Sequence, residues 1–419
     1  MKLGIIADDF TGATDVAGFL VSHGVRTVQI LGVPQSDSPI EAEAYVISLK
    51  SRSCPVKSAV EMSLSSLKWL RDCGCTHIYF KYCSTFDSTA EGNIGPVADA
   101  IMEALNEKKT LVCPSLPVNG RTVYQGYLFV YDKLLNESGM QDHPVTPMKD
   151  AKLKRLLAPQ TKYQIGEIDA ADIDRGPEEV REKIARLTEE GCSYLVVDTL
   201  KDAHLDCIAE AASDFTFFTG GSGLAAAIAR RWKGSDGAAD QAGESFRPAG
   251  GKTVILAGSC SRMTNKQVKK YSGIGASFFI DTEEVLNNPE YLKEVTRWVE
   301  EHLEDLYAPM VYATKSPEQL AMSKERYGDL QTGERIEAFF GILGEKLLAL
   351  GVRNYIIAGG ETAGKIVQAL NLEAFHIGPQ IDPGVPWVKA VDREVYLALK
   401  SGNFGAEDFF RKAQGENDG

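Results

Sequence analysis

The sequence has no excess of positive charge and no long apolar run. Its 419 residues carry a formal net charge of −13 at pH 7, which argues against a nucleic acid or an anionic membrane as partner, since both bind basic surfaces. No apolar stretch approaches the roughly 18 residues that a membrane-spanning helix needs. The apolar run at the N-terminus is too short for a signal peptide and is interrupted by acids. We therefore expect a cytoplasmic protein that binds small molecules.

Paired metal-binding cysteines and histidines are also missing. The eight cysteines are scattered, and only Cys73 and Cys75 lie close together, as Cys-x-Cys. Without a Cys-x-x-Cys pair or a His-Glu-x-x-His motif, a structural zinc site is not expected. We expect the cysteines to be reduced and mostly buried.

What is present is the alternation of an α/β protein. Short β-branched runs alternate with amphipathic stretches, a pattern typical of parallel strands joined by helices. Residues 3–7 are predicted as a strand, and residues 12–23 as a helix that Gly24 ends. Further strands are predicted in the runs RTVQIL, AYVISL, HIYFKY and CSYLVVDT.

A change of composition divides the chain. Residues 233–250 are rich in Gly, Ala, Ser and Asp, and the α/β pattern restarts after them with KTVILAGS. Because 419 residues exceed what one core usually supports, we expect two domains. These are residues 1–232 and 251–419, each a mainly parallel sheet flanked by helices.

Two adjacent acids follow the first strand, in ADDFTGATD at residues 7–15. Asp9 or Thr11 could simply cap the next helix. Capping needs only one such residue, however, and Asp8 and Asp9 stand together. A carboxylate at a strand end can accept the proton of a substrate hydroxyl, or help to hold a metal ion, but would repel a phosphate. The pair therefore points to a hydroxyl-bearing substrate.

Basic residues follow two other predicted strands. Arg52 lies in LKSRSCP, and Lys81 opens KYCSTFDST, which also contains Ser84, Thr85 and Asp87. An arginine suits a substrate carboxylate because its planar fork donates two parallel hydrogen bonds. These residues supply the local positive charge that an acidic protein needs for an anionic ligand. PVNGRTVYQG contributes a further exposed arginine, Arg121.

Three glycine-rich turns lie between predicted strands and helices. TGGSGLA at 219–225 could present amides to an anion or could simply allow close strand–helix packing. In the C-terminal half, ILAGSCSRMTNKQV at 255–268 and YIIAGGETAGKI at 355–366 favour a nucleotide. The second fits the spacing of a P-loop from Gly359 to Lys365 but continues with isoleucine where Ser or Thr would bind magnesium. Thr264 and Gln267 form a capping-box pattern.

The ordered set of motifs resembles the four-carbon acid sugar kinases. The matching segments are ADDFTGATD, KYCSTFDST, PVNGRTVYQGYLFV, GGSGLA, AGGETAG and GPQIDPGVPW, and they span nearly the whole chain.

This resemblance implies an N-terminal substrate domain, a C-terminal nucleotide domain and an active site in the cleft between them. It implies ATP-dependent phosphorylation of the terminal hydroxyl of a four-carbon sugar acid by direct in-line transfer, with Mg²⁺ held largely by the ATP phosphates. Asp9 and Asp8 are the catalytic candidates, and which of them takes the proton is left open, with Asp9 favoured. Carried over by matching motif, the sugar acid would meet Asp8, Thr11, Arg52, Lys81, Ser84, Thr85, Asp87 and Arg121, and ATP would meet Ser259, Gly359, Gly360, Glu361, Thr362 and Gly402.

Other functions remain as alternatives at this point. A nucleotide-gated sensor would keep the glycine turns but would not need the acids. A dinucleotide oxidoreductase should show G-x-G-x-x-G after its first strand, where this chain has Asp-Asp-Phe-Thr-Gly. Within the kinases, the resemblance points to 3-oxo-tetronate as the acceptor, with a threonate or erythronate kinase as the alternative. A homodimer is expected only because such assemblies are frequent.

Overall fold

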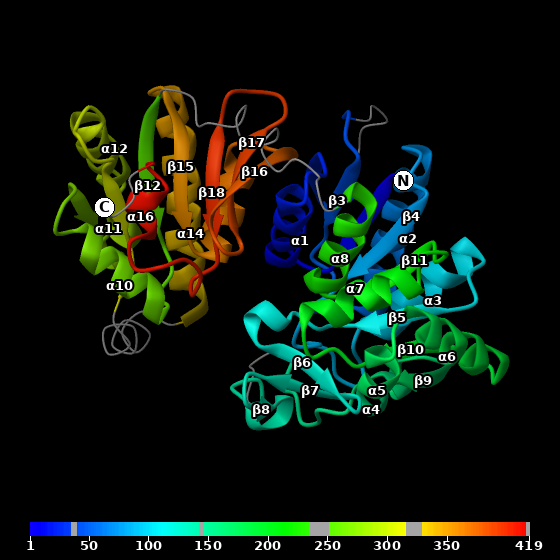
Figure 1. The fold of residues 1–419 in the computed structure, drawn as a ribbon. Coiled ribbons are helices and arrows are strands. Elements are labelled where there is room, and N and C mark those ends of the chain that lie inside the picture. Colours follow the sequence, from blue (N-terminus) through cyan, green and yellow to red (C-terminus); the bar gives the residue numbers. More distant parts are fainter. Residues whose placement is uncertain (35–39, 142–145, 235–250, 316–328, 416–419) are drawn as a thin grey trace. The chain divides into compact units, whose positions relative to one another are not determined.

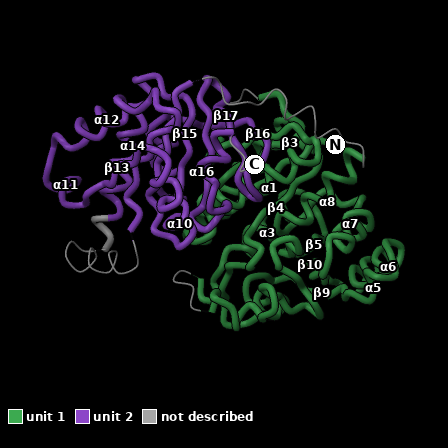
Figure 2. Tube along the Cα trace, turned by 60° about the vertical axis from the view of Figure 1, so that its left-hand side comes forward, with its two compact units in different colours: residues 1–241 green, residues 242–419 purple. Residues whose placement is uncertain are grey.

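The computed structural model describes residues 1–34, 40–141, 146–234, 251–315 and 329–415. The chain divides into two compact units, residues 1–241 and 242–419 (Figure 2). The predicted linker at 233–250 lies almost entirely outside the described residues. Each unit is an α/β structure built on a largely parallel sheet (Figure 1).

The sheet of unit 1 is parallel throughout, in the strand order β2-β3-β1-β4-β11-β5-β10-β9. β1 is buried along its whole length, as a strand covered on both faces must be, and this explains its uninterrupted apolar sequence LGIIA. The strands are β1 (Leu3–Ala7), β2 (Thr27–Leu31), β3 (Ala44–Ser48), β4 (His77–Lys81), β5 (Thr110–Cys113), β9 (Gln164–Ile168), β10 (Cys192–Val197) and β11 (Phe217–Gly220).

Helices cover both faces of this sheet. The chain leaves β1 toward β2 on one side and leaves β3 toward β4 on the other, so right-handed crossovers place the connecting helices on opposite faces. The contacts between helices agree with this. On one face α1 contacts α8, α8 contacts α7 and α7 contacts α6, and on the other face α2 contacts α3. The helices are α1 (Phe10–Ser22), α2 (Val56–Asp72), α3 (Ile94–Leu105), α4 (Leu153–Leu157), α5 (Ala170–Asp174), α6 (Pro177–Glu189), α7 (Asp202–Ala211) and α8 (Ser222–Lys233).

A small antiparallel sheet is inserted between β5 and β9. It consists of β6 (Arg121–Tyr124), β7 (Tyr127–Val130) and β8 (Lys133–Leu134). Three short 3-10 helices flank it: η1 (Pro117–Asn119), η2 (Leu135–Glu137) and η3 (Ala158–Gln160).

The sheet of unit 2 has the order β13-β14-β12-β15-β18-β17-β16, and only β17 runs against its neighbours. An apolar core packs α10 and α16 against one face of β12, β15 and β18. The strands are β12 (Lys252–Ala257), β13 (Ser277–Phe279), β14 (Met310–Tyr312), β15 (Val352–Ala358), β16 (Ala374–Asp382), β17 (Val385–Ala390) and β18 (Tyr396–Lys400), and the helices are α10 (Arg262–Tyr271), α11 (Thr282–Asn287), α12 (Tyr291–His302), α14 (Asp329–Ala349), α15 (Gly360–Ala369) and α16 (Phe409–Lys412).

Several local predictions can be compared with these elements. The first helix begins at Phe10, two residues earlier than predicted, because the Asp9 side chain already caps it. Gly24 follows its end with a positive φ of 77°, as expected of a glycine stop. The Thr264–Gln267 capping box is wrong: the Ser261 hydroxyl caps α10, and the Gln267 amide donates to backbone carbonyls of the loop after β18.

The cysteine prediction is only partly right. All eight thiols are free, but only Cys75, Cys113 and Cys192 are buried, and the other five are partly exposed.

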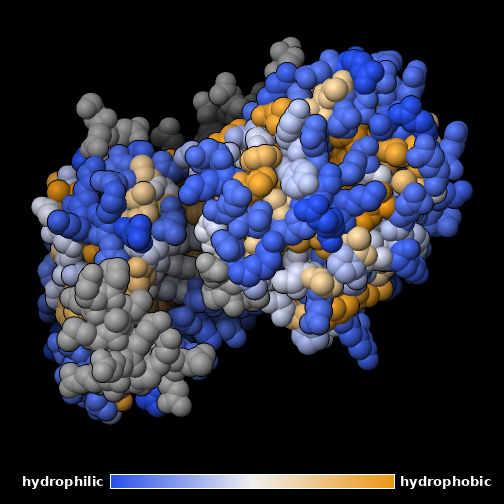
Figure 3. Space-filling model, turned by 90° about the horizontal axis from the view of Figure 1, so that it is seen from below, coloured by the Kyte–Doolittle hydropathy of each residue, from blue (hydrophilic) through white to orange (hydrophobic). Residues whose placement is uncertain are grey.

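The surface of the molecule is mainly hydrophilic where Figure 3 shows it. On the face drawn in Figure 3, hydrophilic residues predominate and hydrophobic residues appear in small groups. Among the described helices, none is both long enough and apolar enough to span a bilayer.

Candidate active site

Three neighbouring strands of unit 1 end together, and this brings the predicted polar residues together. Ala7 pairs with Ser48 of β3 and with Lys81 of β4, so the segments that follow all leave the same edge of the sheet. The chain turns to opposite sides after β1 and after β3, and ligands of open α/β sheets gather at such a switch point. Asp8 lies there, directly after β1.

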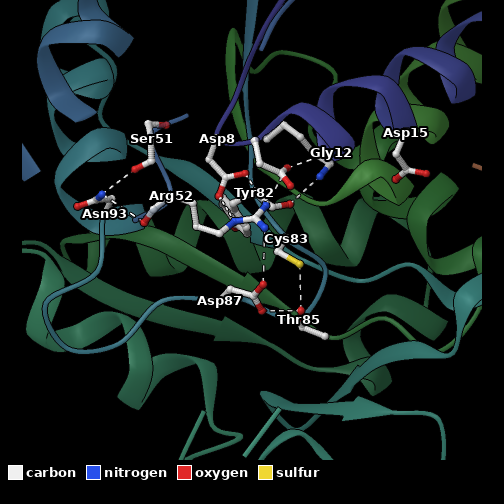
Figure 4. Close-up of polar contacts among 12 residues, drawn as sticks. Asp8, Gly12, Asp15, Ser51, Arg52, Tyr82, Cys83, Thr85, Asp87 and Asn93 are labelled. Carbon is white, nitrogen blue, oxygen red and sulfur yellow. Dashed lines mark hydrogen bonds and ion pairs between the residues drawn. The ribbon is translucent and has the colours of Figure 1, made fainter. Parts of the chain in front are cut away.

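Arg52 lies at the centre of the cluster (Figure 4). Its Nε and Nη2 donate to the two oxygens of Asp8 at 2.9 and 2.8 Å, a bidentate pair. Nη2 also lies 2.8 Å from Asp9 Oδ1, and Nη1 lies 3.7 Å from Asp87 Oδ2. The chain's own carboxylates thus engage the arginine that the sequence assigned to a substrate carboxylate.

Burial makes this pairing necessary. Asp8 is only 5% exposed, and an unpaired carboxylate there would be costly. Burial raises the pKa of Asp8, and the charge and hydrogen bonds of Arg52 oppose that rise. Burial would also lower the pKa of Arg52, but the charges of Asp8 and Asp9 outweigh it and raise that pKa above its ordinary value. The guanidinium therefore stays charged and fixes both aspartates.

Asp9 has two tasks. Its Oδ1 accepts the Gly12 N–H at 2.9 Å, which is the capping role considered from the sequence, and the same oxygen contacts Arg52. Its side chain is 30% exposed, against 7% for Asp8, so Asp9 is the more accessible of the two. A side chain at Gly12 would lie 2.4 Å from Asp9 Oδ1 and 2.9 Å from Lys81 Nζ. Because Gly12 has no side chain, the Asp9 carboxylate and the Lys81 ammonium can lie close to the start of α1.

Lys81 is buried at the end of β4, with 3% of its surface exposed. Its Nζ donates to the Tyr82 carbonyl at 2.9 Å. Burial raises the pKa of Asp8 and of Asp15, and the charge of Lys81 opposes both rises. It is thus a cation of the cluster that, unlike Arg52, has no carboxylate within ion-pair distance in the described part of the chain.

The loop after Lys81 forms the opposite side of the cluster. Thr85 donates its hydroxyl to Asp87 at 2.6 Å and lies 2.9 Å from the sulfur of Cys83. Between them, Phe86 has a φ of 49°, a left-handed conformation that costs energy for a bulky residue. Its ring is fully buried against Tyr82, which holds the loop in this shape.

Sequence reasoning missed two supporting residues. The Asn93 amide donates to the carbonyls of Ser51 (2.7 Å), Cys54 (2.9 Å) and Arg52 (3.3 Å), so it fixes the loop that presents the arginine. No sequence motif marked this asparagine. The carboxylate of Asp15, although part of the ADDFTGATD motif, was not proposed as a site residue; it accepts the Ser222 hydroxyl at 2.5 Å.

The turn at 219–225 serves packing. Side chains at Gly220, Gly221 and Gly223 would each lie within 2.5 Å of a backbone carbonyl oxygen of residues 113–115. Because the Ser222 hydroxyl is directed to Asp15, the close-packing interpretation of this turn is favoured over an anion site.

Three predicted substrate residues have a looser connection to the contacts of the Arg52 cluster. Thr11 and Ser84 are half-buried, in the first turn of α1 and in the loop after β4. Arg121 begins β6, donates to the Asn119 carbonyl and lies with its guanidinium 5.4 Å from the centre of the Tyr131 ring. Across the described ranges, no hydrogen bond or ion pair joins Arg121 to the Arg52 cluster.

Unit 2 repeats the arrangement of strand ends with different chemistry. Ala257, Ala358 and Lys400 are paired neighbours at the ends of β12, β15 and β18, so the turns containing Ser259, Gly359 and Gly402 leave the same edge. A side chain on Gly402 would lie 2.4 Å from Ser259 Oγ. These two predicted ATP residues are in close contact.

The start of α15 is suited to an anion. Gly359 has a φ of 128°, which only glycine adopts readily, and the helix has no side-chain cap. The N–H groups of its first turn, from Gly360 through Glu361 to Thr362, are therefore not used by a capping side chain, and the helix dipole favours negative charge there. The Gly360 position has open space around it, so a phosphate could approach the backbone.

The two units thus carry complementary sets of groups. Unit 1 gathers carboxylates and cations at its strand ends, and unit 2 gathers glycine turns and a helix start without a side-chain cap. Within the ranges that the structure covers, no group of three or more His, Cys, Asp or Glu could hold a metal ion.

Two family models match the chain. Residues 3–228 match a sugar-binding N-terminal domain, and residues 254–410 match a nucleotide-binding C-terminal domain. The matches correspond to the two units and to the chemistry of their strand ends.

Full-length relatives agree with these matches. The chain is 51% identical to a 3-oxo-tetronate kinase of Pectobacterium atrosepticum and 52% identical to one of Haemophilus influenzae, in both cases over 99% of each chain. Its fold is similar to the crystal structure of a Haemophilus influenzae protein, with a TM-score of 0.90 and 52% identity, covering 98% of this chain and 99% of the other.

Proposed function

The chain belongs to the four-carbon acid sugar kinase family, and we propose that it transfers the γ-phosphoryl group of ATP to the terminal (4-) hydroxyl of 3-oxo-tetronate. The product is 3-oxo-tetronate 4-phosphate. The observation that carries this proposal is the identity of about half of all positions to named 3-oxo-tetronate kinases along the whole chain. The carboxylate–cation cluster of unit 1 and the glycine turns of unit 2 support it.

In this proposal unit 1 binds the sugar acid. Lys81 and Arg52 supply positive charge for the substrate carboxylate, and Thr85, Asp87 and Asp8 surround them. Because Arg52 already meets three carboxylates of the protein, we assign it both a structural and a binding task. Thr11, Ser84 and Arg121 remain proposed contacts of the acid.

Asp9 is the proposed general base. It is the more exposed acid of the pair, and Gly12 and Arg52 fix its orientation. The substrate hydroxyl oxygen forms a bond to the γ-phosphorus, the bond from that phosphorus to the β–γ bridging oxygen breaks, and ADP leaves. The hydroxyl proton passes to the Asp9 carboxylate.

Unit 2 is the proposed nucleotide domain. Ser259, Gly402 and the turn Gly359–Thr362 are the proposed ATP contacts, since a phosphate can reach their backbone amides and hydroxyls. Mg²⁺ would neutralise charge on the β- and γ-phosphates. We assign this ion mainly to the oxygens of ATP and to water, because Mg²⁺ usually keeps several waters and binds substrate phosphates.

Consumption of ATP supports the cytoplasmic location expected from the sequence. The expected homodimer remains a proposal, which sedimentation velocity would test.

The deciding experiment is an ATP-consumption assay with 3-oxo-tetronate, D-threonate and D-erythronate as acceptors. We expect the highest kcat/KM with 3-oxo-tetronate and a product phosphorylated at the 4-position. A preference for threonate or erythronate would replace the substrate but keep the reaction. Binding of ATP without turnover on any acid would support the sensor alternative instead.

A further inference from the structure

Lys400 is a buried lysine of unit 2 to which neither the sequence motifs nor the proposed mechanism gives a role. It is the last residue of β18 and is 1% exposed. Its Nζ lies 3.0 Å from the Gly402 carbonyl, 3.1 Å from the Ser401 carbonyl and 3.1 Å from Thr264 Oγ1. A lysine ammonium has three donors, and here each can meet an acceptor.

Thr264 completes the same set of contacts. This residue of α10 is fully buried, and its hydroxyl donates to the Gly402 carbonyl at 2.8 Å. Its N–H donates to Ser261, the cap of α10, and a side chain on Gly402 would contact both Ser261 and Ser259. Lys400 and Thr264 therefore hold the Gly402 turn against the Ser259 turn.

The position of these carbonyls determines where the neighbouring amides point. In a trans peptide the C=O and the following N–H point in opposite directions, and the described chain has no cis bond. Because the carbonyls of Ser401 and Gly402 face Lys400, the N–H groups of Gly402 and Asn403 face away from it. Neither N–H donates to an acceptor among the described residues. Two adjacent amides without acceptors form the kind of concave surface that binds anions.

A packing role alone does not explain a lysine here. Burying an ammonium is costly, and within the described chain no carboxylate lies within ion-pair distance of Lys400. Burial lowers the pKa of Lys400 to about 7. An unbranched apolar side chain such as methionine would fill the space without this cost.

We infer that Lys400 is a positioning residue for the nucleotide: it holds the carbonyls of Ser401 and Gly402 so that the amides of Gly402 and Asn403 are directed at the ATP phosphates. The inference rests on the proposed kinase function and adds Asn403 to its nucleotide contacts. Lys400 acts through the backbone of the loop and does not touch ATP.

The test compares Lys400→Met with Lys389→Met in the full-length protein. Lys389 lies on β17, paired with Glu394 at the surface, and is a matched control. We expect Lys400→Met to raise the KM for ATP by about tenfold or more, the scale of lost hydrogen bonds to a charged group, and to leave the KM for the sugar acid within about twofold. Lys389→Met should leave both KM values unchanged.

A second variant covers the case in which Lys400→Met does not fold. Thr264→Val removes the hydroxyl that links Lys400 to Gly402 and that also accepts the Ser261 hydroxyl, and Thr296→Val on α12 is its control. Thr264→Val should raise the KM for ATP severalfold without changing the KM for the acid. An unchanged KM for ATP in Thr264→Val, or in a folded Lys400→Met, would overturn the inference, and so would an equal rise of both KM values.

Failure of the inference is distinguishable from failure of the proposed function. Calorimetric titration of the parent protein with Mg-ATP measures the function on its own. If the parent binds ATP and the two variants bind it equally well, only the role of Lys400 is lost. If the parent binds no ATP, the nucleotide assignment of unit 2 is wrong, and the inference is wrong with it.

Discussion

Arg52 meets three carboxylates of its own chain, although the sequence suggested a substrate carboxylate as its partner. Burial raises the pKa of Asp8, the bidentate contact with Arg52 opposes that rise, and the contact with Asp9 orients the proposed base. Removing the arginine would leave Asp8 buried and unpaired. The loss of one partner of a buried ion pair lowers the free energy of unfolding by about 3–5 kcal/mol. A change of Arg52 to a short side chain such as alanine would therefore lower stability and substrate binding together, and the two effects could not be told apart.

Arg52→Lys separates these effects. The charge remains beside Asp8, but the planar fork that contacts Asp8 and Asp9 together is lost. We expect a folded protein in which the KM for the sugar acid rises by about tenfold or more, on the scale of a lost charge-assisted hydrogen bond. The KM for ATP should change by less than about twofold. Steady-state kinetics with each substrate varied in turn measures both, and an unchanged KM for the acid would remove Arg52 from the binding site.

Asp9→Asn tests the general base. Asparagine is as good a helix cap as aspartate, so α1 and the fold should be retained. We expect kcat to fall by roughly 10²-fold or more, because an amide cannot take the hydroxyl proton. ATP affinity by calorimetry should stay near that of the parent. Asp8→Asn serves as the comparison: a larger loss of kcat in that folded variant would move the base to Asp8.

At the level of elements, the end of β18 and the start of α10 are linked through one buried amine, that of Lys400. Lys400 has an ordinary pKa of 10.5, and burial lowers it to about 7 in the folded protein. Between these values the unfolded chain holds a proton that the folded protein has released, so unfolding takes up a proton. The free energy of unfolding must then rise with pH from about 7 toward 10, because below pH 7 the folded state carries the full cost of the buried charge.

Urea unfolding at pH 6.5 and pH 9 tests this contribution. The parent should gain stability toward pH 9 relative to Lys400→Met, which has no group to titrate at this position. Comparing the two proteins cancels the titration of the other groups. Parallel pH dependences of the two urea midpoints would show that Lys400 keeps an ordinary pKa.

At the level of the whole molecule, we propose that each unit binds one of the two substrates, as the family matches and the chemistry of the strand ends indicate. The sugar-binding match ends at residue 228, and the nucleotide-binding match begins at residue 254. Each proposed set of contacts lies on the carboxyl edge of its own sheet. Binding of the two substrates should therefore be separable by single substitutions in the intact chain.

Gly360→Val tests this separation. The position is exposed and has open space around it, so the fold should accept valine. The new side chain would keep phosphates from the amides at the start of α15. We expect ATP binding to be lost in calorimetric titration while the affinity for the sugar acid is retained. Full ATP affinity in this variant, or loss of acid binding, would contradict the division.

Much of the fold was predictable from local sequence. Uninterrupted apolar runs such as LGIIA are typical of parallel strands buried on both faces, and Gly24 marked the end of α1 because it takes a conformation that other residues avoid. The Asp8–Asp9 pair and the turn at Gly359 were singled out because adjacent acids and glycine-rich turns at strand ends can serve a ligand as well as the fold, and their place in a binding site stays a prediction. Each of these signals is contained within a few consecutive residues, so it can be read from the sequence alone.

Only the tertiary structure decided which partner each polar group has. Asn93 donates to the Arg52 loop, Gln267 donates to the loop after β18, and Lys400 donates to Thr264. The partners in these hydrogen bonds are 41, 137 and 136 residues apart in the sequence. The same holds for the glycines at 220–223, which pack against carbonyls of residues 113–115 rather than bind an anion. The physical reason is that a side chain's capacity to donate or accept is set by its residue type. Whether an acceptor, a carboxylate or solvent faces it depends on strand order and register, which bring distant parts of the chain together.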